Sequence, residues 1–159
     1  MPNDKIDRFG TSQAQLQQLV YTMETTSNYG RGDATYLALG AQSGIRHLVD
    51  VFYETMEHKK AYRTIWDLHT QEREVMRDRL ALFLCMWSGG PKLYIEKYGS
   101  INIPKVHAHL PVSKTEVQQW LNCMREALVI QQYPQDLIDY LIINFTIPAE
   151  KIRKTCEKK

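Results

Sequence analysis

The chain has 159 residues, which is most simply one domain and is long enough to bury a hydrophobic core. It carries 20 Lys and Arg against 18 Asp and Glu, a net charge of +2, so no large basic field favours nucleic acid or an anionic membrane as a partner. No apolar run approaches the length of a membrane span and no hydrophobic signal region precedes the first helix, so we expect a cytoplasmic protein without membrane association.

An amphipathic helix is the first predicted element. Ser12 and Gln15 form a capping-box pattern, and apolar residues follow at helical spacing at positions 16, 19, 20 and 23. A polar linker then spans residues 25–32. We therefore expect residues 1–32 to form an N-terminal extension with one helix, and residues 33–159 to form the main domain with a short basic C-terminal tail.

Two helices are predicted over residues 33–58. Asp33 can cap a short helix that ends at Gly40. Ser43 can start the next helix, in which apolar residues share one face. The members of that face are Ile45, Leu48, Phe52 and Met56. Over residues 59–70 we expect a short helix and a corner.

The longest central helix is expected next. Thr70 can cap it and Gly89-Gly90 ends it. Pro91 suits the first turn of a small helix that ends at Gly99.

Two further helices complete the predicted fold. Ser113 and Glu116 form a second capping box. Pro134 opens a last core helix, which we expect to stop before Pro148. No segment alternates with period two, so the prediction is an all-α protein without a sheet.

Two histidines and the cysteines are interpreted as residues without a role in metal binding. His47 and His58 are typical of an exposed helix face. The three cysteines are far apart and form no CxxC pair, so they do not indicate a zinc site. Cys85 and Cys123 lie among apolar neighbours and are predicted to be reduced core residues, and Cys156 stands alone near the end of the chain.

One histidine has a setting that suits metal binding. His107 lies between Pro104 and the helix start at Ser113, in a segment too short for a long helix. Trp120 follows thirteen residues later, on the next helix. Such a segment can present a single imidazole to the iron of a flat apolar cofactor. His109, two residues away, is the competing candidate.

The stretch from residue 80 to residue 124 resembles the truncated haemoglobins, and within them group II. The resemblance extends over about residues 36–147. It rests on Phe52-Tyr53, Arg79-Leu80, Phe83-Leu84, Trp87-Ser88-Gly89-Gly90-Pro91, Tyr94, Tyr98-Gly99, His107, and Trp120-Leu121 with Cys123-Met124. It implies a truncated globin fold, a two-over-two helical sandwich, with an added N-terminal helix and a haem b cofactor.

The resemblance assigns roles to the residues around the haem. It implies His107 as the axial ligand of a pentacoordinate iron, with Tyr53 and Trp120 as hydrogen-bond donors to a bound ligand. Bound dioxygen takes negative charge from ferrous iron, and a phenol and an indole stabilise that charge in a dry pocket. Without the resemblance, both aromatics would be read as core residues with their polar ends satisfied locally. The resemblance also implies pocket positions for Met76, Leu80 and Phe83.

The corner before the central helix matches less well. Counting forward from Tyr53, the aromatic residue that wedges the haem in relatives is Trp66. Counting back from Leu80, it is Leu68. This chain therefore carries a two-residue insertion nearby. We favour Trp66, because a flat ring can pack on a porphyrin, and His69 is the alternative that would enter the distal side.

The haem propionates require cations or hydroxyl groups. Arg79 matches a helix arginine that pairs with them in relatives, and Tyr94 and Lys105 are candidate substitutes for further arginines. The alternative is that the two cations are solvated surface charges. A further departure is Gly40-Ala41, where relatives often have Gly-Gly, and we interpret the alanine as a mild change.

The predicted function is reversible binding of dioxygen, nitric oxide, carbon monoxide or peroxide at ferrous haem. Two strong donors predict slow release of dioxygen, which argues against bulk transport and favours scavenging, sensing or redox detoxification. Nitric oxide dioxygenase-like or peroxidase-like activity would need electrons from a separate reductase. The competing hypotheses are a cofactor-free helical interaction module and a haem protein that is mainly a peroxidase.

Overall fold

The computed structural model describes residue 10, residues 12–18 and residues 28–157. Over these ranges the regular elements are helices and no β-strand occurs, which confirms the predicted all-α class. After a helical segment at residues 13–18, the elements are α2 (Ala34–Ala38), α3 (Ala41–His58), the 3₁₀ turn η1 (Lys60–Tyr62), α4 (Arg63–Asp67), α5 (Arg73–Trp87), α6 (Leu93–Tyr98), α7 (Ile103–His107), α8 (Lys114–Ile130) and α9 (Gln135–Glu157).

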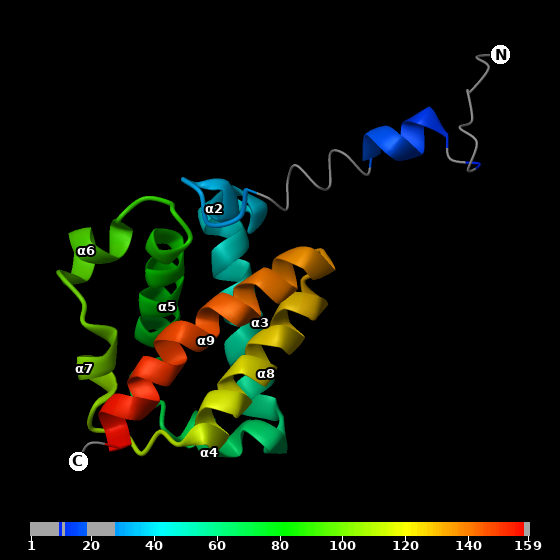
Figure 1. The fold of residues 1–159 in the computed structure, drawn as a ribbon. Helices are drawn as coiled ribbons and strands as arrows, with labels where there is room; N and C mark the ends of the chain where they lie inside the picture. The colour runs from blue at the N-terminus through cyan, green and yellow to red at the C-terminus, as the bar shows by residue number, and fades with distance from the viewer. Residues whose placement is uncertain (1–9, 11, 19–27, 158–159) are drawn as a thin grey trace.

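Four long helices form the body of the molecule (Figure 1). Helix α3 packs against α5 on one side and against α8 on the other, and α8 packs against α9. The short helices are attached to this body, with α6 against α5 and α7 against the C-terminal part of α9. The pairs α3–α5 and α8–α9 make the predicted two-over-two sandwich. In the described part of the chain, no helix is both long and apolar enough to cross a lipid bilayer.

The N-terminal capping box is present. The backbone N–H of Ser12 donates to Oε1 of Gln15 at 2.9 Å, and the N–H of Gln15 donates to Oγ of Ser12 at 3.2 Å. Helical residues follow at 13–18. The predicted continuation through positions 19, 20 and 23 lies outside the described residues.

The core is built on the predicted apolar face of α3. All four of its residues are at most 1% exposed: Ile45, Leu48, Phe52 and Met56. The helix begins at Ala41 and not at the predicted Ser43. The chain enters it through two left-handed residues, Gly40 at φ 92° and Ala41 at φ 57°. A backbone turn, rather than a side-chain cap, therefore starts α3.

The central helix α5 differs from its prediction at the N-terminus. It begins after Glu72, which makes no side-chain cap, so the predicted cap at Thr70 is wrong. Its 15 residues also make it shorter than α9, which has 23. The first turn is fixed by the contacts of α5 with α3 instead of by a cap.

The glycine pair ends α5 as predicted, and it also allows a close approach. Gly89 has φ 95°, and a Cβ there would lie 1.8 Å from the carbonyl oxygen of Gly32. A Cβ on Gly90 would lie 2.4 Å from the ring of Tyr36. The pair thus lets residues 32–36 pack onto the end of α5. Pro91 lies outside the next helix, whose N-cap is Lys92.

The predicted end of the last helix before Pro148 is wrong. Helix α9 contains Pro148 and continues to Glu157. Proline removes one backbone hydrogen bond, but the residues beyond it are partly buried, among them Ala149, Ile152 and Cys156, and α9 packs against α7. Tertiary packing therefore overrides the local stop signal.

The predicted basic tail is partly helical. Arg153 lies in α9 with its side chain 11% exposed, and it pairs with Glu150 at 2.8 Å and Glu157 at 2.6 Å. Lys151 and Lys154 belong to the same helix. The remaining lysines, at positions 158 and 159, lie outside the described residues.

Candidate functional site

The predicted axial histidine closes the five-residue helix α7. The side chain of Asn102 caps this helix by accepting from the N–H of Lys105 at 3.1 Å, and Pro104 lies in its first turn. His107 is half-buried, and its Nδ1 lies 2.7 Å from the carbonyl oxygen of Ile103. A carbonyl can only accept, so Nδ1 carries the proton and Nε2 keeps a free lone pair. This is the form in which an imidazole binds a metal.

The competing histidines lie at the surface. His109 is exposed, in contrast to the half-buried His107. His47 and His58 are also exposed, in agreement with the helix-face interpretation. The structure therefore favours His107 over His109 as the imidazole available to an interior cofactor.

The two predicted distal donors lie on α3 and α8 and share one aromatic neighbour. Tyr53 is 6% exposed, and its ring centroid lies 5.1 Å from that of Phe52. Trp120 is half-buried, with its ring 5.3 Å from Phe52 and 5.5 Å from Phe145. Within the described ranges, neither the Tyr53 hydroxyl nor the Trp120 indole N–H has a hydrogen-bond partner. Their polar ends are thus not satisfied locally.

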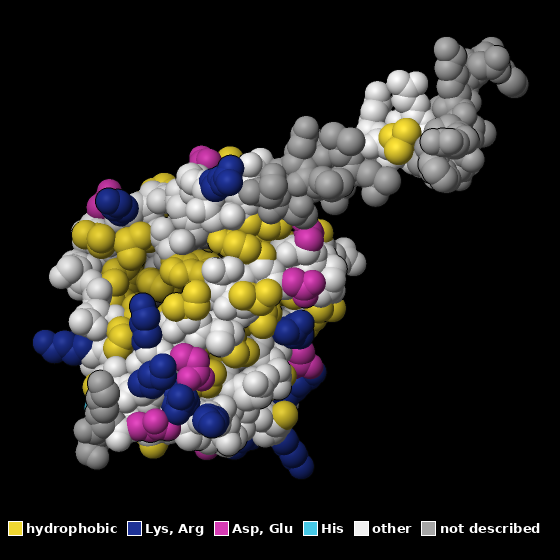
Figure 2. Space-filling view, in the orientation of Figure 1, with side chains coloured by type: hydrophobic (Ala, Val, Ile, Leu, Met, Phe, Trp, Pro, Cys, Tyr) yellow, Lys and Arg dark blue, Asp and Glu magenta, His cyan; other side chains and the backbone are white. Residues whose placement is uncertain are grey.

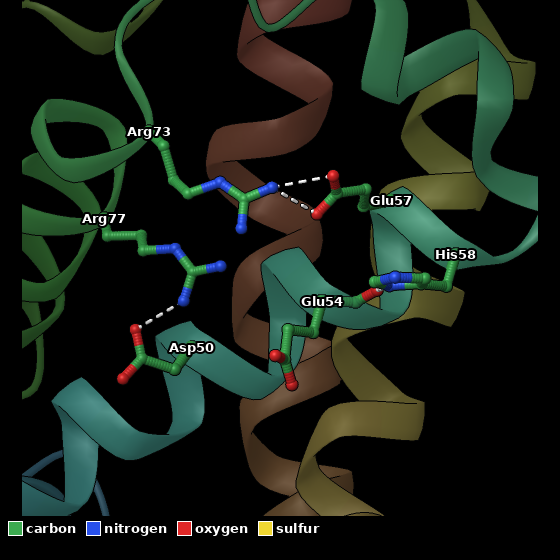
Figure 3. A network of polar contacts seen from close by, with 6 residues as sticks. All are labelled: Asp50, Glu54, Glu57, His58, Arg73 and Arg77. Carbon is green, nitrogen blue, oxygen red and sulfur yellow. Dashed lines mark hydrogen bonds and ion pairs between the residues drawn. The ribbon is translucent and has the colours of Figure 1, made fainter.

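An ion-pair network joins α3 and α5 (Figure 3). Arg73 binds both carboxylate oxygens of Glu57, at 2.7 and 2.6 Å, and Arg77 binds Asp50 at 2.7 Å. Burial raises the pKa of the Tyr53 hydroxyl well above its usual value, and the positive charge of Arg77 only partly opposes this shift. Tyr53 is consequently a neutral phenol that can donate a hydrogen bond.

At the corner between α4 and α5, a histidine contacts Tyr53. The ring of His69 meets the ring of Tyr53 edge to face with centroids 5.5 Å apart. Trp66, the favoured candidate, and Leu68 are both half-buried, and Trp66 packs against the core. Of the three candidates that the sequence left open, His69 is the one whose ring packs on Tyr53.

Three apolar side chains of α5 were predicted to line the pocket. Met76 is 7% exposed, and Leu80 and Phe83 are half-buried against the edge of the core. Figure 2 shows apolar side chains gathered on the face above α5, α6 and α9. Of the three predicted pocket residues, Met76 thus belongs to the buried core, while Leu80 and Phe83 lie at its edge.

Of the three residues predicted to bind the propionates, the structure brings two together. Nη1 of Arg79 donates to the hydroxyl of Tyr94 at 3.2 Å, and its guanidinium lies 4.3 Å from the ring centroid of Tyr98. Nε of Arg79 is buried and has no partner among the described residues. A buried guanidinium N–H without an acceptor suits a carboxylate. Lys105, by contrast, is exposed and makes no ion pair with described residues.

Asp78 is a structural residue that the sequence reading missed. Its carboxylate binds Arg46 at 3.0 Å, Lys97 at 2.7 Å and the hydroxyl of Tyr98 at 2.5 Å, so it joins α3 and α6 to α5. Burial alone would raise the pKa of Asp78, but the bonds to Lys97, Tyr98 and Arg46 outweigh it and lower the pKa to about 2. Nothing in the sequence distinguishes this aspartate from a surface charge. It steadies the helices that carry Arg79 and Tyr94.

Comparison with known proteins decides the family. The protein-family model described as bacterial-like globin matches residues 34–153. The chain belongs to the bacterial-like globins. This globin is 29% identical over 96 residues to the group 2 truncated hemoglobin YjbI of Bacillus subtilis, over 60% of its own length and 70% of that protein.

Solved structures confirm the truncated globin fold. A cold-adapted truncated hemoglobin from Pseudoalteromonas haloplanktis matches with a TM-score of 0.70 at 25% identity, over 74% of this globin and 95% of that chain. The group II hemoglobin of Agrobacterium tumefaciens also gives 0.70, at 24% identity, over 75% and 92%. The chain is therefore a haem-based globin of the truncated type.

The residues present fit a haem. His107 offers an imidazole lone pair, and the half-buried Leu80 and Phe83 offer apolar contact. The unpartnered Nε of Arg79 beside Tyr94 offers a donor to a propionate. These are the kinds of group that a haem requires: an imidazole, apolar contacts and a partner for a propionate.

Proposed function

We propose that this globin binds haem b through Nε2 of His107 and presents Tyr53 and Trp120 to a diatomic ligand on the opposite face. The observation that carries the proposal is the hydrogen bond from Nδ1 of His107 to the carbonyl of Ile103. It fixes the tautomer whose free nitrogen can bind iron, and it orients the ring. When bound, the haem supplies the iron that coordinates the ligand and exchanges electrons.

The distal side chains support tight binding of dioxygen. Tyr53 and Trp120 come from different helices, and both present a donor that no described residue uses. Two donors beside a bound ligand stabilise negative charge on it and slow its release. One related structure, 23% identical to this chain, is titled a truncated oxygen-avid haemoglobin from Bacillus subtilis. Slow release argues against bulk transport.

We therefore favour ligand scavenging or redox detoxification in the cytoplasm. The ligands are dioxygen, nitric oxide, carbon monoxide or peroxide. Repeated turnover in oxidation of nitric oxide or in reduction of peroxide needs electrons from outside the chain, so a separate reductase is the expected partner. Arg79 and Tyr94 hold the propionates in this proposal, and Met76, Leu80, Phe83 and Trp66 contact the ring.

Spectra of two histidine variants test the axial ligand. The purified full-length protein, expressed with ample haem, should contain iron and show a Soret band. In ferric, ferrous and carbonyl forms, His107→Ala should lose the native axial bond, while His109→Ala should match the parent. Added imidazole should restore the parent spectrum to His107→Ala. A colourless parent would contradict haem binding and would favour a cofactor-free interaction module.

Resonance Raman spectra test the distal donors. In the carbonyl form, Tyr53→Phe and Trp120→Phe should each shift the iron–ligand stretching frequency, because each removes a donor to the ligand. Both substitutions keep the aromatic ring or its apolar bulk, so packing on Phe52 is largely preserved. Unaltered frequencies in both variants would remove these residues from ligand stabilisation.

A further inference from the structure

His69 and His107 share one hydrogen-bonding arrangement. Nδ1 of His69 lies 2.7 Å from the carbonyl oxygen of Ile65, four residues earlier, just as Nδ1 of His107 lies 2.7 Å from that of Ile103. Since a carbonyl only accepts, Nδ1 of His69 carries the proton. Both imidazoles are therefore held in the tautomer that leaves Nε2 with a lone pair.

His69 also lies on the side of the predicted distal donor. Its ring meets Tyr53 edge to face at 5.5 Å. Burial lowers the pKa of His69. The hydrogen bond to Ile65 partly opposes this shift, and the nearby His107 adds to it because two imidazolium charges would repel one another. His69 is consequently neutral at pH 7. The two imidazoles come from distant segments, the corner before α5 and the end of α7, yet each lies within electrostatic reach of the other.

The hydrogen bond to Ile65 excludes one role for His69 and favours another. A neutral His69 whose only N–H is bonded to Ile65 has no proton left to donate to bound dioxygen. What it can offer is a lone pair, which would repel a negatively charged ligand but can coordinate a metal. His69 is therefore unsuited to be a third distal donor and suited to be a ligand of iron.

We infer that Nε2 of His69 coordinates the haem iron opposite His107 in the resting protein, so that an external ligand must displace it. The inference rests on the proposed binding of haem at His107. His69 lies in the turn after α4, outside the helices that build the core, where a ring can swing away. The predicted pentacoordinate iron is then the state from which the ligand binds.

Two other side chains are weaker candidates for the same position. The Tyr53 hydroxyl stays neutral, because burial raises its pKa, and a neutral phenol is a poor iron ligand. Met76 offers only a thioether, and its side chain is 7% exposed on the regular helix α5. An imidazole is the strongest donor of the three at neutral pH.

The electronic state of the iron tests the inference directly. The ferric full-length protein should be low-spin, with an electron paramagnetic resonance spectrum typical of two imidazole ligands. His69→Leu should convert it to a high-spin form while keeping the Soret band. The matched controls His109→Leu, at an exposed histidine, and Met76→Leu should keep the low-spin spectrum.

Ligand-binding kinetics give a second, independent readout. If His69 occupies the iron nine-tenths of the time, carbon monoxide should bind the ferrous His69→Leu protein about tenfold faster than the parent. The parent rate should level off at high carbon monoxide concentration, because departure of the imidazole becomes limiting. The variant rate should stay proportional to concentration.

The outcomes separate this inference from the proposed function. A coloured, high-spin parent that His69→Leu leaves unchanged would overturn the role of His69 and leave His107 as the axial ligand. A low-spin parent converted to high spin by Met76→Leu alone would equally overturn it. A parent without haem would instead contradict the proposed function itself.

Discussion

The thiol of Cys156 donates a hydrogen bond to the carbonyl oxygen of His107, with Sγ and O 3.2 Å apart. This contact joins the last turns of α9 to a helix that precedes it by 49 positions. Helix α7 has five residues and no fully buried side chain, and it packs against α9. The end of α9 therefore helps to position the imidazole that we propose as the axial ligand.

The first prediction concerns this contact. Cys156→Ala should lower the free energy of unfolding by up to about 1 kcal/mol, because the His107 carbonyl loses one of its two donors and keeps only the N–H of Leu110. Haem loss to an excess of apomyoglobin should become up to about fivefold faster, the rate equivalent of that energy. The matched variant Cys156→Ser keeps a donor and should stay closer to the parent. Equal rates in Cys156→Ala and the parent would show that the contact does not steady α7.

Candidates for the proximal and distal residues could be named from the sequence, because rare residues lie at informative spacings. The spacing from His107 to Trp120 matches the family pattern without a gap. Among the residues that the structure describes, the polar ends of Tyr53 and Trp120 have no hydrogen-bond partner. The corner was ambiguous, because a two-residue insertion shifts the count by half a helical turn. Only the folded chain shows that the ring of His69 lies against Tyr53.

The errors in the fold have a common cause. The cap expected at Thr70 and the stop expected before Pro148 are local signals, and both are overridden by packing between helices. The start of α3 at Ala41 depends on two left-handed residues, which side-chain patterns do not reveal. Asp78 has three partners on other segments, and the sequence gives no indication of partners that distant.

The second prediction concerns the glycine pair at the end of α5. Gly89→Ala should lower the free energy of unfolding by about 3 kcal/mol, because it adds a left-handed alanine and forces a methyl group into the Gly32 carbonyl. The control Gly32→Ala is also left-handed, at φ 50°, but its Cβ meets nothing within 4 Å. It should cost only about 1 to 2 kcal/mol. If urea unfolding gives the same loss of unfolding free energy for both variants, the close approach of Gly89 to the Gly32 carbonyl has no energetic role.

The third prediction concerns acid stability. The pKa of Asp78 is about 2 in the folded protein against 3.8 ordinarily, so its ionised form stabilises the fold above about pH 4. That contribution is lost as the pH falls through about 2. Asp78→Asn should therefore lower the urea midpoint at pH 6, and its difference from the parent should shrink between pH 4 and pH 2.

A charge-matched control separates this effect from net charge. Glu74→Gln removes a carboxylate that is exposed on the same helix. Its urea midpoint should stay close to that of the parent throughout the titration, since exposed charges contribute little. An Asp78→Asn difference that is constant from pH 6 to pH 2 would contradict the assigned role of the carboxylate.

The fourth prediction tests whether α9 is one helix. Pro148 lacks the N–H that would bond to the carbonyl of Asn144, so Pro148→Ala restores a backbone hydrogen bond within a continuous helix. After allowing for the greater freedom of the unfolded chain, the free energy of unfolding should rise by about 1 to 2 kcal/mol. The control Pro134→Ala alters a proline just before α9 and should not stabilise the protein. If Pro148→Ala instead lowers the free energy of unfolding in urea, the helix ends at the proline. Contacts other than those with a continuous α9 would then hold α7.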